Sequence, residues 1–166
     1  TGYQSDAGIE CSDVDNVRIY NNTVWRLNND YNGRGIRFIQ NIANTQMVNN
    51  LVYGRLVFDN NLTISRNEKN LSGNISSGYV VDVSTGDLHL TASAANAINN
   101  GVQLAEVTDD IDGNARGTTP DIGADEYVTS GGGTTNPGGG TTNPGGGSTN
   151  PGGGTTNPGG GTTNPG

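Results

Sequence analysis

Three oxygen-bearing side chains alternate along a short stretch near the end of the charged part of the chain. Asp110, Asp112 and Asn114 occupy every second position around Gly113. Oxygen ligands at alternate positions of a Gly-containing loop are typical of calcium sites, so calcium is the one cofactor that the sequence suggests. A structural alternative stays open, in which Asp112 pairs with Arg116 and the loop accepts turn amide hydrogens.

A complete calcium loop also supplies a later bidentate carboxylate. Here such a group could come only from residues that fold back onto the loop. The candidates for this role are Asp121, Asp125 and Glu126.

His89 and Cys11 are the only residues of their types. Any catalytic triad would have to use His89, yet its place between Leu88 and Leu90 indicates an outward position in a strand with an exposed or turn-bonding role. A single thiol forms no internal disulfide, and zinc spacing of Cys and His residues is absent. We therefore expect Cys11 to lie in a core and leave the catalytic residues unassigned.

The composition excludes several classes of function. The chain has 166 residues, a formal net charge of -8 and only eight basic residues, which are scattered singly. Nucleic acids and anionic membranes both need clustered positive charge, so neither is an expected partner. No apolar run approaches the roughly 18 residues of a membrane span. The chain opens in mid-pattern without Met, so we expect it to be the C-terminal part of a longer polypeptide.

The chain divides at about residue 130. Residues 131–166 repeat Gly-Gly-Gly-Thr-Thr-Asn-Pro five times, with one Ser substitution, and contain neither charged nor apolar side chains. Such a segment cannot offset the entropy lost on ordering, so we predict a disordered linker at 131–166. A linker implies a further module or anchor beyond it, although a plain disordered tail remains an alternative.

The folded part, residues 1–130, contains an internal repeat. The pair Gly8-Ile9 recurs as Gly35-Ile36, and the run NNTVW at 21–25 recurs as NNLVY at 49–53, 28 residues later. Short stretches with alternating apolar and polar residues lie inside each unit, for example at 17–20 and 36–39. The stretch at 62–67 resembles the strand and Asn turn at 17–22 with altered spacing.

A repeat of short strands separated by Asn or Gly turns predicts an all-β parallel solenoid, in which each coil adds one strand to each of several sheets. Asn tolerates the left-handed corner conformation, and its amide can bond to an Asn at the same place in the next coil. We expect Asn22 and Asn50 to form such a pair. An antiparallel sandwich with Asn hairpins is the alternative.

The second half of the chain carries a family resemblance. The relevant runs are GYVVDVSTGDLHL at 78–90, AANAINNG at 94–101, DIDGNAR at 110–116 and PDIGADEY at 120–127. Together they resemble the closing region of secreted right-handed parallel β-helix repeat proteins, which include bacterial polysaccharide lyases and other carbohydrate-active proteins. The resemblance implies the C-terminal coils and cap of such a β-helix, with residues 109–127 as the cap.

The resemblance also implies a function. The parent protein would be secreted or located at the cell surface and would act on an extracellular polysaccharide, by β-elimination of an acidic glycan or as a related glycosidase. A saccharide groove in such proteins runs along outward strand faces, which makes Arg18, Trp25, Arg26 and Arg37 candidate groove residues. The competing hypothesis is a noncatalytic adhesin or carbohydrate-binding stalk. With one Lys, one His and no Lys-Arg pair of family spacing, we expect this chain alone to be inactive, with its catalytic coils upstream.

Overall fold

The structure is a computed structural model that describes residues 7–26, 32–59 and 62–128, so the linker predicted at 131–166 lies outside the described residues. The regular structure of the described chain is almost all β, in short strands joined by turns and loops. The 3-10 helix η2 (Ser77–Tyr79) has three residues. No helix in this part of the chain has the length and apolar character needed to cross a membrane.

Eleven short strands form four parallel sheets, which confirms the all-β prediction and the parallel pairing. The first sheet contains β1 (Ile9–Cys11), β5 (Arg34–Phe38) and β9 (Arg55–Phe58). The second contains β3 (Arg18–Tyr20), β7 (Gln46–Val48) and β10 (Arg66–Glu68). The third contains β4 (Thr23–Trp25), β8 (Leu51–Tyr53) and β11 (Leu71–Gly73). The fourth pairs β2 (Val14–Asp15) with β6 (Ile42–Ala43).

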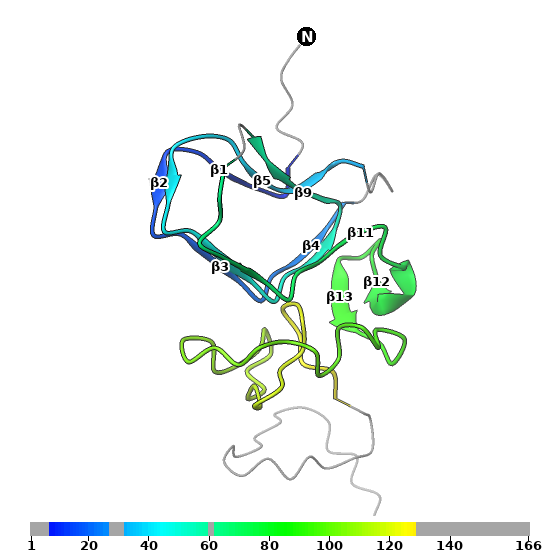
Figure 1. Cartoon of the computed structure of the whole chain (residues 1–166). Coiled ribbons are helices and arrows are strands. Elements are labelled where there is room, and N and C mark those ends of the chain that lie inside the picture. The colour runs from blue at the N-terminus through cyan, green and yellow to red at the C-terminus, as the bar shows by residue number, and fades with distance from the viewer. Residues whose placement is uncertain (1–6, 27–31, 60–61, 129–166) are drawn as a thin grey trace, which may run out of the picture.

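The chain visits these sheets in a fixed order and then returns to the first. We call each passage a round: 9–25, 34–53 and 55–73. Figure 1 looks down the stack of rounds, whose strands form the sides of one closed outline. Equivalent residues of the first two rounds are 27 or 28 positions apart, whereas those of the last two are 20 apart. The extra residues lie between Trp25 and Arg34, where the next round has only Gly54.

Apolar side chains from successive rounds stack inside the outline. Ile19 lies in register with Met47, and Phe38 stacks on Phe58 with ring centroids 5.6 Å apart. Ile36, Phe38 and Met47 are fully buried. Because each inward residue packs on its counterparts in neighbouring rounds, burial of this stacked core is the main stabilising contribution.

The recurrence of Gly before Ile has a packing explanation. Gly8 and Gly35 are hydrogen bonded through Gly8 N and Gly35 O at 2.9 Å. A Cβ on Gly35 would come within 2.2 Å of Val52 Cγ1, and one on Gly8 within 2.4 Å of Val24 Cγ1. Only glycine therefore lets β1 and β5 approach the core valines of β4 and β8.

The turns between strands use residues in the left-handed backbone conformation, at equivalent positions of successive rounds. The three sets are Asp13 with Asn41, Asn16 with Asn44, and Asn21 with Asn49 and Lys69, all with φ between 48° and 59°. Asn and Asp adopt this conformation at less cost than other side-chain-bearing residues. This backbone requirement explains the high Asn content of the repeat.

A ladder of Asn side chains runs through the same turns. The predicted pair is confirmed, since Asn22 Nδ2 donates to Asn50 Oδ1 at 2.9 Å. The ladder continues into the third round, where Asn50 Nδ2 donates to Asn70 Oδ1 at 2.7 Å. The resemblance of residues 62–67 to 17–22 puts Ile64 in the place of Ile19, and this register was wrong. Asn67 takes that place, because Arg66 pairs with Gln46, and Gln46 with Arg18.

The C-terminal segment does not continue the parallel sheets. Strands β12 (Val80–Asp82) and β13 (Asp87–Leu90) form an antiparallel hairpin, and residues 91–128 form turns and loops. In Figure 1 this segment lies beside one corner of the outline. Gly123 N donates to Asn49 O at 2.9 Å, and Ala124 N donates to Thr23 Oγ1 at 2.9 Å.

These contacts correct the prediction that residues 109–127 form a terminal cap. The segment covers the flank of the first and second rounds. An apolar cluster holds it there, in which Ile122 and Leu90 pack with the fully buried Leu51 of β8. The apolar residues of the run at 120–127, which we call the closing motif, therefore pack against the side of the β4–β8–β11 sheet.

Candidate functional site

A row of hydrogen-bond donors lies on the outer face of the β3–β7–β10 sheet. Arg18, Gln46 and Arg66 are in register across the three strands. Their orientation follows from strand alternation, because the next residues in β3 and β7, Ile19 and Met47, point into the core. We call Arg18, Gln46 and Arg66 the donor row.

Neighbouring groups orient the row. Tyr20 Oη donates to Gln46 Oε1 at 2.6 Å, which occupies the amide oxygen and leaves the amide nitrogen as the donor available for another molecule. The guanidinium of Arg66 lies 2.9 Å from Glu68 Oε2. Arg18 Nε lies 3.9 Å from Glu106 Oε1, and both side chains are about half exposed. Exposed ion pairs of this kind contribute little to the free energy of folding, so both guanidinium groups can leave their carboxylate partners and bind another molecule.

The other three predicted groove residues are not part of this row. Arg37 lies on the outer face of the β1–β5–β9 sheet, where it pairs with Glu10 and Asp59. Trp25 stacks on Tyr53, with centroids 4.8 Å apart and planes at 10°. Arg26 donates from Nη1 to Arg34 O at 3.3 Å. The predicted set of four is therefore distributed over different sheets, and Arg37 cross-links three rounds.

The predicted calcium residues also point in different directions. Asp110 Oδ1 accepts the backbone N–H groups of Asp112 and Asn114 at 2.9 and 2.7 Å. Asp110 Oδ2 accepts Asn114 Nδ2 and Glu126 N, both at 3.0 Å. Asp112 turns away and contacts His89 Nε2 at 2.9 Å. Asp110 thus orders its own loop, and calcium binding by this set stays a prediction that the observed directions do not favour.

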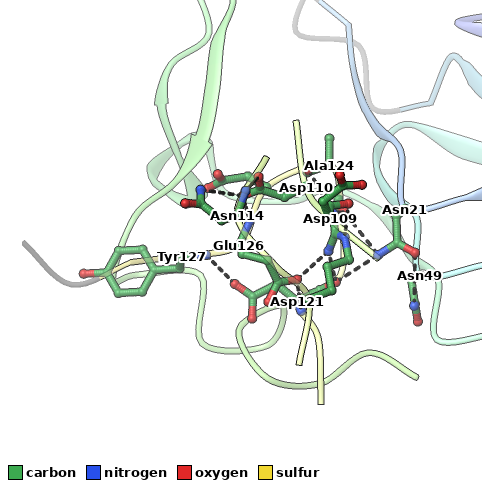
Figure 2. A network of polar contacts seen from close by, with 12 residues as sticks. Asn21, Asn49, Asp109, Asp110, Asn114, Asp121, Ala124, Glu126 and Tyr127 are labelled. Carbon is green, nitrogen blue, oxygen red and sulfur yellow. Dashed lines mark hydrogen bonds and ion pairs between the residues drawn. The ribbon is translucent and has the colours of Figure 1, made fainter. Parts of the chain in front are cut away.

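The alternative pairing of Asp112 with Arg116 was wrong. The Arg116 side chain is 3% exposed and forms an ion pair with Glu126. Its guanidinium also donates to the backbone carbonyls of Asp109, Asp121, Gly123 and Ala124. Figure 2 shows this network. Arg116 satisfies the carbonyls of two loops that lack regular structure.

Two carboxylates complete the network, the buried Asp121 and the half-buried Glu126. Asp121 accepts Asn99 N and Tyr127 N, both at 2.6 Å, and Glu126 accepts Asp121 N at 2.7 Å. Burial raises the pKa of Asp121, although these hydrogen bonds oppose the shift. Burial raises the pKa of Glu126 to about 7, despite the opposing charge of Arg116. The carboxylates of Asp121 and Glu126 therefore have a structural role, because they accept hydrogen bonds from backbone N–H groups.

His89 and Cys11 lie in different parts of the fold. His89 is exposed as expected, and it contacts two carboxylates that sequence reasoning did not connect with it. Cys11 packs against the stacked core, and burial raises the pKa of its thiol. A neutral, half-buried thiol is a poor nucleophile, which agrees with the expected core role.

Sequence reasoning did not align Gln46 and Arg66 with Arg18. Their alignment depends on two unequal offsets, 28 and 20 residues, so no single period places them together. The NN and KN pairs at 21–22, 49–50 and 69–70 were the signal that could have fixed the register. Comparisons with protein-family models, with curated proteins and with solved structures find no match to this chain.

Proposed function

We propose that residues 7–128 are the C-terminal rounds of a right-handed parallel β-helix whose donor row binds an acidic extracellular polysaccharide. The parallel sheets and the stacked rounds support the fold part of this proposal. The single observation that carries the binding part is the in-register alignment of Arg18, Gln46 and Arg66 on one outer face.

The direction of the row suits a linear polymer. Neighbouring strands of a sheet lie about 4.8 Å apart, so the row presents one donor group at each such step along the stack. A sugar chain that runs across the strands would meet Arg18, Gln46 and Arg66 in turn. Tyr20, which lies beside the row and is half-buried, adds an aromatic edge and a phenolic oxygen.

The chemistry of the row favours acidic sugars. Guanidinium groups bind carboxylates with two parallel hydrogen bonds, and such charge-assisted bonds are about twice as strong as neutral ones. The amide nitrogen of Gln46 suits a hydroxyl or carbonyl oxygen between two such contacts. A protein with net charge -8 needs a local arrangement of this kind to bind an anionic polymer at all.

For this chain we favour polysaccharide binding without catalysis. Among the described residues, neither Lys69 nor His89 is in the donor row: Lys69 occupies a turn after β10, and His89 belongs to β13 beside two carboxylates. A lyase or glycosidase activity, if present, belongs to the parent protein. A carbohydrate-binding stalk is the second candidate, and it fits the same donor row.

Glycan binding by the full chain tests the proposal. Titration with polygalacturonate or alginate oligomers should show binding that weakens with salt, and a neutral glucan of equal length should not bind. Replacing one row arginine, in Arg18→Ala or Arg66→Ala, should weaken binding about tenfold, as loss of a hydrogen bond to a charged group costs about 1.5 kcal/mol or more. Arg55→Ala removes an exposed arginine of another sheet and is the matched control. Equal losses in all three variants would refute a specific row.

A further inference from the structure

Four side chains converge where β13 meets the loops that follow it. His89 and Asp87 belong to β13, Asp112 to the loop at 109–116, and Asp125 to the closing motif. His89 Nδ1 lies 2.6 Å from Asp87 Oδ1, and His89 Nε2 lies 2.9 Å from Asp112 Oδ2. His89, Asp112 and Asp125 each offer a ligand atom within 4.8 Å of the other two.

Asp125 is the buried member of the group. Its residue is 6% exposed, and its Oδ2 accepts Leu90 N at 2.6 Å. The buried side chain is fixed by this backbone hydrogen bond, which holds the carboxylate beside His89 and Asp112.

The group carries an excess of negative charge. Three carboxylates surround one imidazole, and even a protonated His89 would supply only a single positive charge.

We propose that His89 Nε2, Asp112 and Asp125 bind a divalent transition-metal ion, with zinc as the reference ion. One imidazole nitrogen and two carboxylate oxygens form a three-ligand set for zinc that leaves a fourth position open. Asp87 holds Nδ1–H of the imidazole, which is the second-shell arrangement of metal-bound histidines. This site is independent of the donor row and of polysaccharide binding.

The geometry requires a small closure. Ligands 2.0–2.2 Å from a tetrahedral zinc ion lie roughly 3.4 Å apart, so the widest pair must approach by about 1 Å or slightly more. The Asp112 side chain is 53% exposed and can supply this movement. Its carboxylate would leave the His89 Nε2 contact and share the metal with that nitrogen. The ion would then add a link between β13, the 109–116 loop and residues 120–127, besides the apolar cluster and the hydrogen bonds of Asp110 and Arg116.

The proposal is tested by isothermal titration of the chelator-treated full chain with Zn²⁺. The titration is run at about pH 7.5, where the imidazole can lose its proton on metal binding. We expect one equivalent to bind and to raise the unfolding temperature in a concentration-dependent manner. Ca²⁺ should bind at least tenfold more weakly, because it prefers all-oxygen sites. Failure to bind Zn²⁺, or stronger binding of Ca²⁺, would overturn the assignment.

Single-residue variants identify the ligands. Loss of a second-shell group costs about 10–100-fold in affinity, so His89→Gln and Asp112→Asn should each weaken Zn²⁺ binding by about 100-fold or more. Asp112 has an exposed side chain whose one contact in the described structure is His89, so Asp112→Asn should fold normally. Asp109→Asn removes a nearby exposed carboxylate and should leave affinity unchanged. Unchanged affinity in Asp112→Asn, or an equal loss in Asp109→Asn, would refute the site.

Discussion

Removal of the middle amide of the Asn ladder should destabilise the stacked rounds strongly. Asn50 is fully buried, and its Oδ1 accepts both the backbone N–H and the side-chain amide of Asn22 at 3.0 and 2.9 Å. Its Nδ2 donates to Ile19 O at 2.8 Å and to Asn70 Oδ1 at 2.7 Å. In Asn50→Ala, the Asn22 N–H and the Ile19 carbonyl lose these partners in the interior. Each unsatisfied buried group costs about 1–3 kcal/mol, so we expect a loss of about 2–5 kcal/mol.

Urea unfolding followed by circular dichroism measures this loss. Asn96→Ala is the matched control, because Asn96 is exposed and should change the free energy of unfolding by less than about 0.5 kcal/mol. Asn50→Asp provides a second readout. Its carboxylate would face carbonyl oxygens, so its folded-state pKa should rise and its stability deficit should grow as pH rises above about 4. A cost of Asn50→Ala equal to that of Asn96→Ala would show that the ladder contributes nothing.

Three further changes test the backbone and charge arguments, each by urea unfolding. Lys69→Asn should raise the free energy of unfolding by about 0.5 kcal/mol, because Lys69 has φ 53° where Asn is less strained; a decrease would contradict this. Gly35→Ala should cost about 1–3 kcal/mol by overpacking against Val52. Gly117→Ala, whose Cβ would meet nothing within 4 Å, should be neutral, and equal effects would refute the packing argument. The pKa of Glu126 is about 7 in the fold and 4.5 ordinarily, so the folded state holds a proton that the unfolded state loses and stability falls as pH rises through this window. Glu126→Gln should flatten that slope, and an unchanged slope would exclude Glu126 as its cause.

The sequence predicted the features that depend on short-range pattern. Period-two alternation identified Arg18 as outward and Ile19 as inward, and the recurring Asn pair predicted the contact between Asn22 and Asn50. These features are local because strand alternation and left-handed turns depend on a few neighbouring residues. The register of residues 62–67 was wrong because the connection before the third round is only Gly54, which changes the offset from 28 to 20 residues.

Long-range features were not predictable in the same way. The loop at 109–116 contains acidic residues whose spacing resembles a calcium loop, but Asp110 uses both oxygens to accept N–H groups. Asp112 finds its partner 23 residues away, at His89. The lateral position of the segment depends on apolar contacts between Ile122 and Leu51, which are 71 positions apart. No sequence period relates such pairs.

The unequal length of the connections between rounds has a consequence for how such a chain can change. Residues 26–33 join the first round to the second, and Gly54 alone joins the second to the third, yet Trp25 remains in register with Tyr53 and Arg34 with Arg55. The connection at that corner is therefore uncoupled from strand register, and the entropy cost of lengthening it grows only logarithmically, by about 0.6 kcal/mol per doubling. A connection of another length could join Trp25 to Arg34 without redesign of the sheets, whereas Gly54 bonds to Gly73 through both its N and its O and ties the shorter connection to β11. The strand register thus stays fixed while the connection at one corner can change in length.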